Sequence, residues 1–312
     1  MFIVDSHCDS IQKVDAGKFG IVNPYNYSTR MQQLQFVALF CTWPENSVED
    51  CYRRAVRFLG HFFLAMANES DRVLPVKTYA DIEAAFAAGK HAALLTLEGG
   101  TGLKGSPEIL RRFFHCGARV CGLTWLHNDL GKSNRLEEGE EDTGLTEIGR
   151  AMVEEGNRLG MIFDVSHLSD RSFWDLAELS AKPIIATHSN FRALCGHSRN
   201  LTDDMAREIF RQDGMIGLNL CPSFVHDDPE KRTVEQLFAH LDHCLSLGGE
   251  DHIGFGCDID GIGHHYPAPL DESCSVHDRL IDFMLTHNYS ETLVEKVAGG
   301  NYLRFLKQYL PA

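Results

Sequence analysis

The chain has 312 residues, 44% of them hydrophobic, which is enough to bury the core of one large α/β domain or of two smaller domains. Its formal net charge of −15 argues against a nucleic-acid partner, because such a surface needs clustered lysine and arginine side chains. No segment reaches the roughly 20 apolar residues of a membrane span, and the N-terminus lacks the pattern of a signal peptide, so we expect a cytoplasmic protein with no membrane partner.

Eight short apolar runs recur along the chain, and segments with helical spacing of apolar residues separate most of them. Runs of this length are typical of strands buried in a parallel sheet. They cover residues 2–4, 36–41, 91–97, 118–126, 160–167, 183–188, 215–220 and 252–256. Helices are predicted near 46–68, 78–89, 146–159 (with Gly160 as its stop), between 167 and 183, after the N-cap residue Thr202, at 231–247 and at 276–309.

Six of the eight runs lead into an acidic residue or a histidine. These residues are His7 with Asp9, Glu98, His127, His167, His188 and Asp258. The carboxyl ends of all strands of a closed barrel meet at one face, whereas an open doubly wound sheet gathers ligands only at its switch point. With no Pro- or Ser-rich linker to divide the chain, the pattern predicts one (β/α)8 TIM barrel over residues 1–312.

The side chains at these strand ends have the chemistry of a metal site. His7 and Asp9 are two residues apart and would therefore lie on the same face of the first strand. Three histidines and two carboxylates suit Zn²⁺ or a similar divalent ion, and they exceed what a single catalytic ion needs. We therefore predict two ions with a shared carboxylate, which together can hold a hydroxide and polarise a substrate oxygen.

A single histidine at a strand end is more often a hydrogen-bonded structural residue than a ligand, so the hypothesis depends on the whole set. Of the 16 histidines, the twelve outside the set, among them His240, His243, His264 and His265, are expected to be structural. Asp260 is expected to occupy a turn or to support the ligands.

Motifs along most of the chain resemble those of the membrane (renal) dipeptidase family, peptidase family M19 of the amidohydrolase superfamily. They occur in family order between residues 2 and 306. They are DSHCD (5–9), TLEGG (96–100), LTWLHN (123–128), GLTEIG (144–149), NRLGMIFDVSH (157–167), THSN (187–190), HSRNLTD (197–203), GFGCDIDG (254–261) and GGNYLR (299–304).

The resemblance implies a binuclear zinc dipeptidase that hydrolyses L-L dipeptides and, as the family allows, L-D dipeptides by a metal-bridging hydroxide. By this likeness His7 and Asp9 would hold one zinc ion, and His167 and His188 would hold the other. Glu98 would bridge both ions. The partner would be a small dipeptide, and a homodimer is expected from the family.

The likeness also assigns the residues that would handle the substrate. His127 would contact the region of the scissile carbonyl, Arg199 would bind the substrate carboxylate, and Asp258 would shuttle the proton. Departures from the family pattern include Cys8 between the first two ligands and Ile259 between the last two aspartates. The ten cysteines form no Cys-x-x-Cys pair, and we expect reduced thiols, with Cys8 as an inert one.

Two other functions remain open. A different amidohydrolase could act on N-acyl amino acids, lactones or a deaminable base, although deaminases of this superfamily favour His-x-His on the first strand and a single metal. A barrel that binds ligands without turnover is the second alternative. The presence of all the expected ligands together with Asp258 argues against it.

Overall fold

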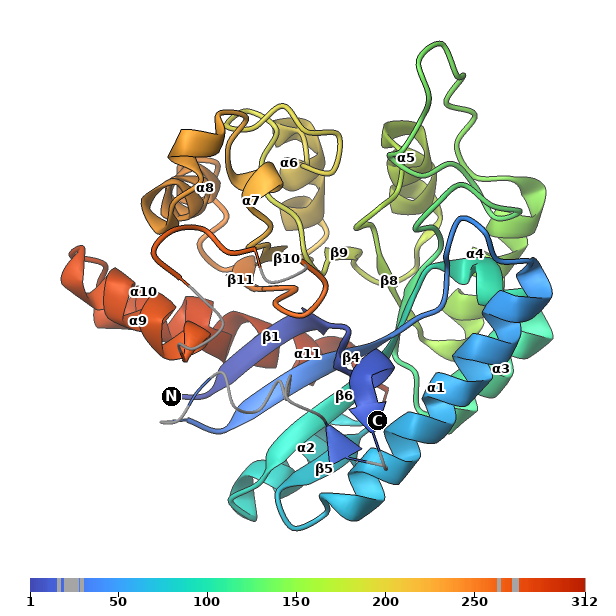
Figure 1. The fold of residues 1–312 in the computed structure, drawn as a ribbon, viewed down its shortest axis with the longest axis horizontal. Helices are drawn as coiled ribbons and strands as arrows, with labels where there is room; N and C mark the ends of the chain where they lie inside the picture. The colour runs from blue at the N-terminus through green and yellow to red at the C-terminus, as the bar shows by residue number, and fades with distance from the viewer. Residues whose placement is uncertain (16–17, 20–27, 29–30, 263–264, 271–274, 312) are drawn as a thin grey trace.

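The computed structural model describes residues 1–15, 18–19, 28, 31–262, 265–270 and 275–311. Eight parallel strands form a closed barrel with helices around it (Figure 1), which confirms the predicted (β/α)8 fold. The ring closes because β1, the first barrel strand, pairs with β4 on one side and with β11, the last barrel strand, on the other. In order around the barrel, the strands are β1 (Ile3–Cys8), β4 (Gln33–Phe40), β6 (His91–Glu98), β7 (Val120–Gly122), β8 (Ile162–Asp164), β9 (Ile185–Ala186), β10 (Met215–Leu218) and β11 (Ile253–Phe255).

Three strands outside the ring were not predicted from the sequence. β5 (Val73–Val76) pairs with the first half of β6, while β7 pairs with its second half, so β5 extends the sheet at the amino end of the barrel. β2 (Val14–Asp15) and β3 (Lys18–Phe19) form a short antiparallel pair. Each of these strands has at most four residues, which is too short to show a periodic pattern.

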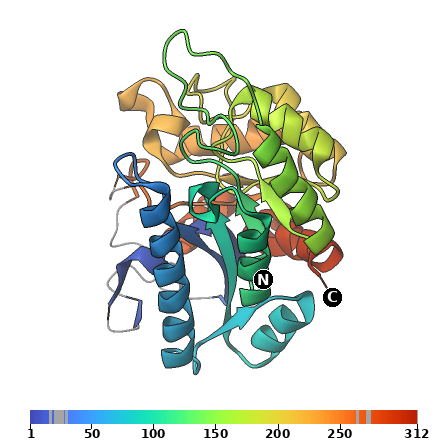
Figure 2. The same ribbon diagram turned by 90° about the vertical axis from the view of Figure 1, so that its right-hand side faces the viewer.

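Helices cover the outside of the barrel, and α1 runs along the strands (Figure 2). The predicted helices are all present, but α3 and the short α7 were not predicted. The segment 276–309 is divided, because α9 ends before Asn288, whose φ of 64° interrupts the helix. The helices are α1 (Val48–Asn68), α2 (Tyr79–Ala87), α3 (Pro107–Cys116), α4 (Glu147–Leu159), α5 (Asp170–Leu179), α6 (Asp203–Arg211), α7 (Pro222–Val225), α8 (Val234–Ser246), α9 (Val276–Thr286), α10 (Glu291–Glu295), continuing through a π turn (Lys296–Gly300) into α11 (Asn301–Tyr309).

Local signals in the sequence set both ends of α4. The Thr146 side chain accepts a hydrogen bond from the Gly149 amide, and Gly160 ends the helix in the left-handed conformation with a φ of 79°. A Cβ atom at Gly149 would lie 1.9 Å from the carbonyl oxygen of Leu130. The glycine therefore lets α4 pack directly against the long loop that follows β7 and reaches the mouth of the barrel.

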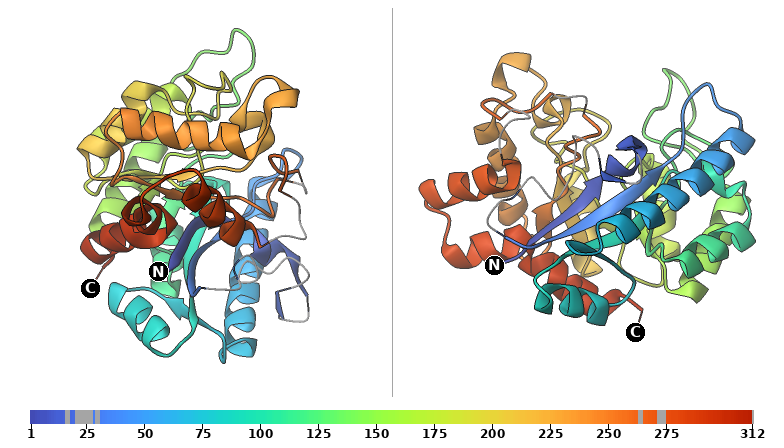
Figure 3. Two further views of the ribbon diagram at one scale, coloured as in Figure 1. Left: turned by 90° about the vertical axis from the view of Figure 1, so that its left-hand side faces the viewer. Right: turned by 60° about the horizontal axis from the view of Figure 1, so that its bottom comes forward.

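The C-terminal helices pack against the first strand, as Figure 3 shows for the red segment beside β1. Tyr302 of α11 is fully buried, and its hydroxyl donates a hydrogen bond to Ser6 Oγ at 2.7 Å. Ser6 Oγ in turn contacts the carbonyl oxygens of Thr187 (2.5 Å) and Phe255 (2.9 Å). These bonds tie β1, β11 and the residue that follows β9 together directly beside His7. In the described part of the chain, no helix combines the length and apolar character needed to cross a bilayer.

Candidate metal centre

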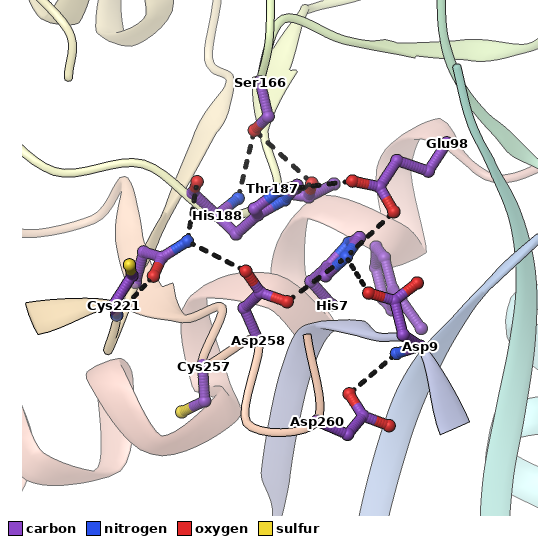
Figure 4. Close-up of polar contacts among 12 residues, drawn as sticks. His7, Asp9, Glu98, Ser166, Thr187, His188, Cys221, Cys257, Asp258 and Asp260 are labelled. Atoms are coloured by element: carbon purple, nitrogen blue, oxygen red, sulfur yellow. Dashed lines mark hydrogen bonds and ion pairs between the residues drawn. The ribbon is translucent and has the colours of Figure 1, made fainter. Parts of the chain in front are cut away.

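Glu98, the last residue of β6, is one of the side chains that converge at the carboxyl ends of the strands, and its carboxylate points toward His7 and His188 (Figure 4). Its Oε1 lies 2.9 Å from His167 Nε2 and 3.7 Å from His188 Nε2. Its Oε2 lies 3.3 Å from His7 Nε2. One carboxylate oxygen therefore faces the pair of histidines that follow β8 and β9, and the other faces the histidine of β1.

Two aspartates complete the cluster on the side of His7. His7 Nε2 lies 3.9 Å from Asp9 Oδ2 and 3.8 Å from Asp258 Oδ1. His7 belongs to two groups of three possible ligands, and within each group the donor atoms lie within 4.8 Å of one another. The first group is His7, Glu98 and His188, and the second is His7, Asp9 and Asp258. The barrel thus brings residues from opposite ends of the chain to one place.

The donor atoms of this cluster fit a divalent metal ion. His7 Nε2, Asp9 Oδ1 and Glu98 Oε2 are buried, and none has a hydrogen-bond partner among the described residues. Buried polar atoms without partners are costly, and several such lone pairs aimed at one place would be satisfied by a cation. Imidazole nitrogens and carboxylate oxygens are the ligands that zinc and neighbouring transition metals use.

The electrostatics of the cluster agree with this interpretation. Burial raises the pKa of Glu98 to about 7, the nearby charge of Asp9 adds to that effect, and His7 opposes it. Burial also raises the pKa of Asp258 well above its usual value. Burial lowers the pKa of His188 well below its usual value, with neighbouring cationic groups adding to the effect. The crowded carboxylates favour a positive charge beside them, and a neutral imidazole is the form that binds metals.

A chain of hydrogen bonds behind His188 fixes which ring nitrogen faces the cluster. Thr187 Oγ1 lies 2.6 Å from Asp164 Oδ2 and 2.7 Å from His188 Nδ1. An ionised carboxylate can only accept, so the Thr187 hydroxyl donates to Asp164 and accepts the proton on Nδ1. The lone pair of His188 Nε2 then faces the cluster. This support was not predicted from the sequence, where its signals are the threonine before His188 and the aspartate at the end of β8.

Replacing Thr187 with valine should weaken metal binding about 10- to 100-fold, the usual cost of losing a partner that orients a ligand. The valine side chain keeps the shape of threonine but cannot accept the proton of His188 Nδ1. Titration of metal-free protein with Zn²⁺ in competition with a chelator measures the change. Thr286→Val is the matched control, because that hydroxyl is exposed and bonds within its own helix. Equal zinc affinity in the two variants would contradict the role of Thr187.

Asp260 and Gly261 hold the aspartates of the cluster in place. Asp260 Oδ1 accepts a hydrogen bond from the Asp9 amide at 2.8 Å, and its other oxygen accepts one from the Ser10 hydroxyl. This position agrees with the supporting role expected for Asp260. A Cβ atom at Gly261 would lie only 2.1 Å from Asp258 Oδ1, so the close approach of that carboxylate requires glycine here.

An open cavity of about 900 Å³ lies over the cluster, and Glu98, His167 and Asp258 form part of its wall. Arg199 also lines it and is only 5% exposed. The Arg199 guanidinium donates to Ser189 Oγ (3.0 Å) and to the carbonyl oxygen of His188 (3.1 Å). The structure therefore places seven of the eight predicted site residues together at one face of the barrel.

The exception is His127, whose exposed side chain lines a separate depression of about 180 Å³ beside Thr42 and Trp43. The apolar run was expected to extend to Leu126, but β7 already ends at Gly122. Beyond that point the chain turns, and Trp125 lines the main cavity instead.

Two residues that were expected to be structural, Cys8 and His240, are buried and contact the core or the backbone. Cys8 belongs to the hydrophobic core, and burial raises the pKa of its thiol well above the usual value. His240 accepts a hydrogen bond from the Phe191 amide, and its other ring nitrogen lies 2.9 Å from a carbonyl oxygen. The nine cysteines in the described ranges are free thiols, while Cys274 and His264 lie outside those ranges.

Comparison with known proteins places the chain in a family. The model of the membrane dipeptidase family, peptidase family M19, matches residues 1–310. The chain belongs to this family. Among relatives of the membrane dipeptidase family, dipeptidase tcpJ of Claviceps purpurea is 35% identical over 239 residues, which are 77% of this chain and 56% of the Claviceps protein. The match therefore spans little more than half of that relative.

Solved structures of family M19 share the whole fold. The metallopeptidase dipeptidase AC superposes with a TM-score of 0.84 at 27% identity, covering 100% of this chain and 99% of that one. A metallopeptidase from Rhodobacter sphaeroides, liganded with a phosphinate mimic of the dipeptide L-Ala-D-Ala, superposes with a TM-score of 0.84 at 26% identity, covering 99% of each chain. Divalent metal use is a property of this metallopeptidase family, and the cluster around Glu98 supplies suitable ligands.

Proposed function

We propose that the protein is a zinc-dependent dipeptidase that hydrolyses the peptide bond of L-L dipeptides and of dipeptides with a D residue at the C-terminal position. The observation that carries the proposal is the position of Glu98, which directs one oxygen toward His7 and the other toward His167 and His188. Membership of a family with named dipeptidases, and the dipeptide mimic bound to the Rhodobacter relative, support this substrate class.

Each half of the cluster would hold one zinc ion. His7 and Asp9 would hold the first ion, His167 and His188 the second, and Glu98 both. Bound there, the ions would supply Lewis acidity and an activated water for attack on the peptide carbonyl. The protein's part is to hold five ligands that come from four strand ends, which the barrel does through the backbone.

Arg199 and Asp258 would act on the substrate itself. The planar guanidinium of Arg199 would bind the α-carboxylate and fix the C-terminal end of the dipeptide. Asp258 would accept a proton from the attacking water and donate it to the leaving amine.

The contact of His127 with the scissile carbonyl stays a prediction. The side chain of His127 lines a separate depression and not the cavity over the cluster. A single domain over 1–312, a homodimer and a cytoplasmic location also stay predictions.

Metal-free protein reloaded with zinc should contain two ions per chain by elemental analysis and should release free amino acids from L-Ala-L-Ala and L-Ala-D-Ala. The five ligands exceed the needs of one ion, which is the physical reason to expect two. A firm value of one ion per chain would contradict the binuclear site. Hydrolysis of N-acetyl-alanine or a lactone without hydrolysis of either dipeptide would favour the other amidohydrolase activity.

A further inference from the structure

Arg135 and Trp125 form a stacked pair at the mouth of the cavity, and the mechanism above uses neither residue. The guanidinium carbon of Arg135 lies 3.9 Å from the centroid of the Trp125 ring. That ring lies 6.0 Å from the ring of His167 and 5.0 Å from the ring of Phe40. Both members of the pair line the cavity. The stack therefore places a cation on the wall of the same cavity as the metal ligands.

The backbone of the loop holds Arg135 beside the cluster. The Asn134 amide donates to the carbonyl oxygen of His167 at 2.9 Å, and the Ser169 amide donates to the carbonyl oxygen of Lys132 at 3.1 Å. The Arg135 amide donates to Ser133 Oγ. The rest of the loop between 129 and 143, green in Figure 1, extends beyond α5, but the segment next to Arg135 is fixed to the end of β8. The position of Arg135 is thus built into the fold.

Arg135 has no direct ion-pair partner within the described residues, although the negative charge of Glu98 partly offsets the lowering of its pKa by burial. Its guanidinium makes neither an ion pair nor a hydrogen bond there, although the chain carries a net charge of −15 and Glu137 and Glu138 follow closely in sequence. Other cations of this region are engaged. Lys132 pairs with Glu140 at 2.5 Å, and Lys13 donates to the carbonyl oxygen of Asp260 at 2.8 Å. Arg135 therefore presents free N–H donors to whatever enters the cavity.

We infer that Arg135, oriented by Trp125, binds a second carboxylate of the substrate, so that the enzyme prefers dipeptides with an aspartate or glutamate side chain. This inference rests on the proposed dipeptidase activity and names its substrate class. Stacking occupies the face of the guanidinium and leaves the N–H groups at its edge free for a bidentate contact with a carboxylate.

The two arginines of the cavity differ in depth, and this difference assigns their roles. Arg199 is 5% exposed and is held by Ser189 and by the carbonyl oxygen of His188, so it suits the α-carboxylate that every dipeptide carries. Arg135 is exposed at the mouth, where a side chain of the substrate would extend. An acidic side chain of the substrate would supply the direct ion pair that Arg135 lacks within the described residues.

Pairs of dipeptides that differ only in charge test the inference. On zinc-loaded enzyme, kcat/KM for Ala-Asp or Asp-Ala should exceed that for the isosteric Ala-Asn or Asn-Ala by about tenfold or more, the scale of a hydrogen bond to a charged group. Arg135→Gln should remove most of this ratio, mainly through a higher KM for the acidic substrate. Arg135→Lys should restore part of it, since lysine keeps the charge without the fork.

Arg207→Gln is the matched control, because it removes an exposed arginine of α6 that, among the described residues, pairs with Asp204 alone and does not line the cavity. It should keep the wild-type ratio. Equal kcat/KM on acidic and amide dipeptides in the wild type, or an equal loss on both in Arg135→Gln, would overturn the inference while leaving the dipeptidase function intact. Failure of the zinc-loaded enzyme to hydrolyse any dipeptide would overturn the proposed function and this inference with it.

Discussion

Glu98→Gln should abolish stable binding of two zinc ions and reduce turnover by more than the 10- to 100-fold that the loss of a supporting partner costs. Glu98 is the residue whose two oxygens face both halves of the cluster, at 2.9 Å from His167 and 3.3 Å from His7. Glutamine has nearly the same shape, but it is neutral, and its amide group would direct N–H donors toward one of the imidazoles. Zinc content per chain and kcat/KM on L-Ala-L-Ala measure the two effects.

A buried carboxylate elsewhere in the fold provides the control for this variant. Glu155 of α4 is 2% exposed and pairs with Arg111 and Arg158 away from the cavity. Glu155→Gln should lower the midpoint of thermal unfolding, because it weakens two ion pairs, and should leave zinc content at two ions per chain. Retention of both ions by Glu98→Gln would show that the two halves of the cluster do not share this carboxylate.

Much of the fold could be predicted because its signals are local and repeated. Each barrel strand is a short apolar run followed by polar residues, and caps such as Thr146 and Thr202 mark helix starts that the structure confirms. The missed elements have weaker local signals. β5 has four residues with only its two end residues buried, and α3 follows a glycine-rich turn that obscures its start at Ser106. Short length and partial exposure therefore account for the missed β5, and the glycine-rich turn before Ser106 accounts for the missed α3.

The predicted metal ligands meet in the structure because they lie at or just after the carboxyl ends of barrel strands, and all these ends are at the same mouth of the barrel. A residue at the carboxyl end of a barrel strand faces the same mouth whatever its neighbours are, so strand assignment was sufficient for His7, Glu98 and His188. His127 lies five residues beyond the end of β7, where no regular alternation applies. Its direction depends on the turn geometry of one loop, which a single sequence does not reveal.

The supporting residues required the three-dimensional structure. Asp260 contacts the backbone of Asp9, 251 positions away in sequence, and no spacing rule could have joined them. Arg135 lies in a loop rich in glycine and acidic residues, where an arginine is ordinarily a solvated side chain. Only the stack on Trp125 and the bond from Asn134 to the end of β8 show that it belongs to the cavity. Loop residues such as Arg135 therefore line the cavity in ways that the pattern of strands does not predict.

Asp258→Asn should leave zinc content near that of the wild type and cut kcat by about a hundredfold or more, the scale of general acid-base catalysis. Asp258 has a φ of 55°, and asparagine is among the few residues that adopt this left-handed conformation readily. The amide also keeps an oxygen that can accept from Asn219 Nδ2, which lies 3.5 Å from the carboxylate. The backbone and the packing should therefore survive while the proton acceptor is lost.

The neighbouring Asp260→Asn separates proton transfer from support of the ligands. Asp260 holds the Asp9 amide and the Ser10 hydroxyl, so its amide variant should weaken zinc binding and recover most of its turnover at saturating zinc. Asp258→Asn should instead stay slow at any zinc concentration, because excess metal cannot replace a missing base. If Asp258→Asn at full zinc occupancy turned over L-Ala-L-Ala at the wild-type rate, another group would have to carry the proton to the leaving amine.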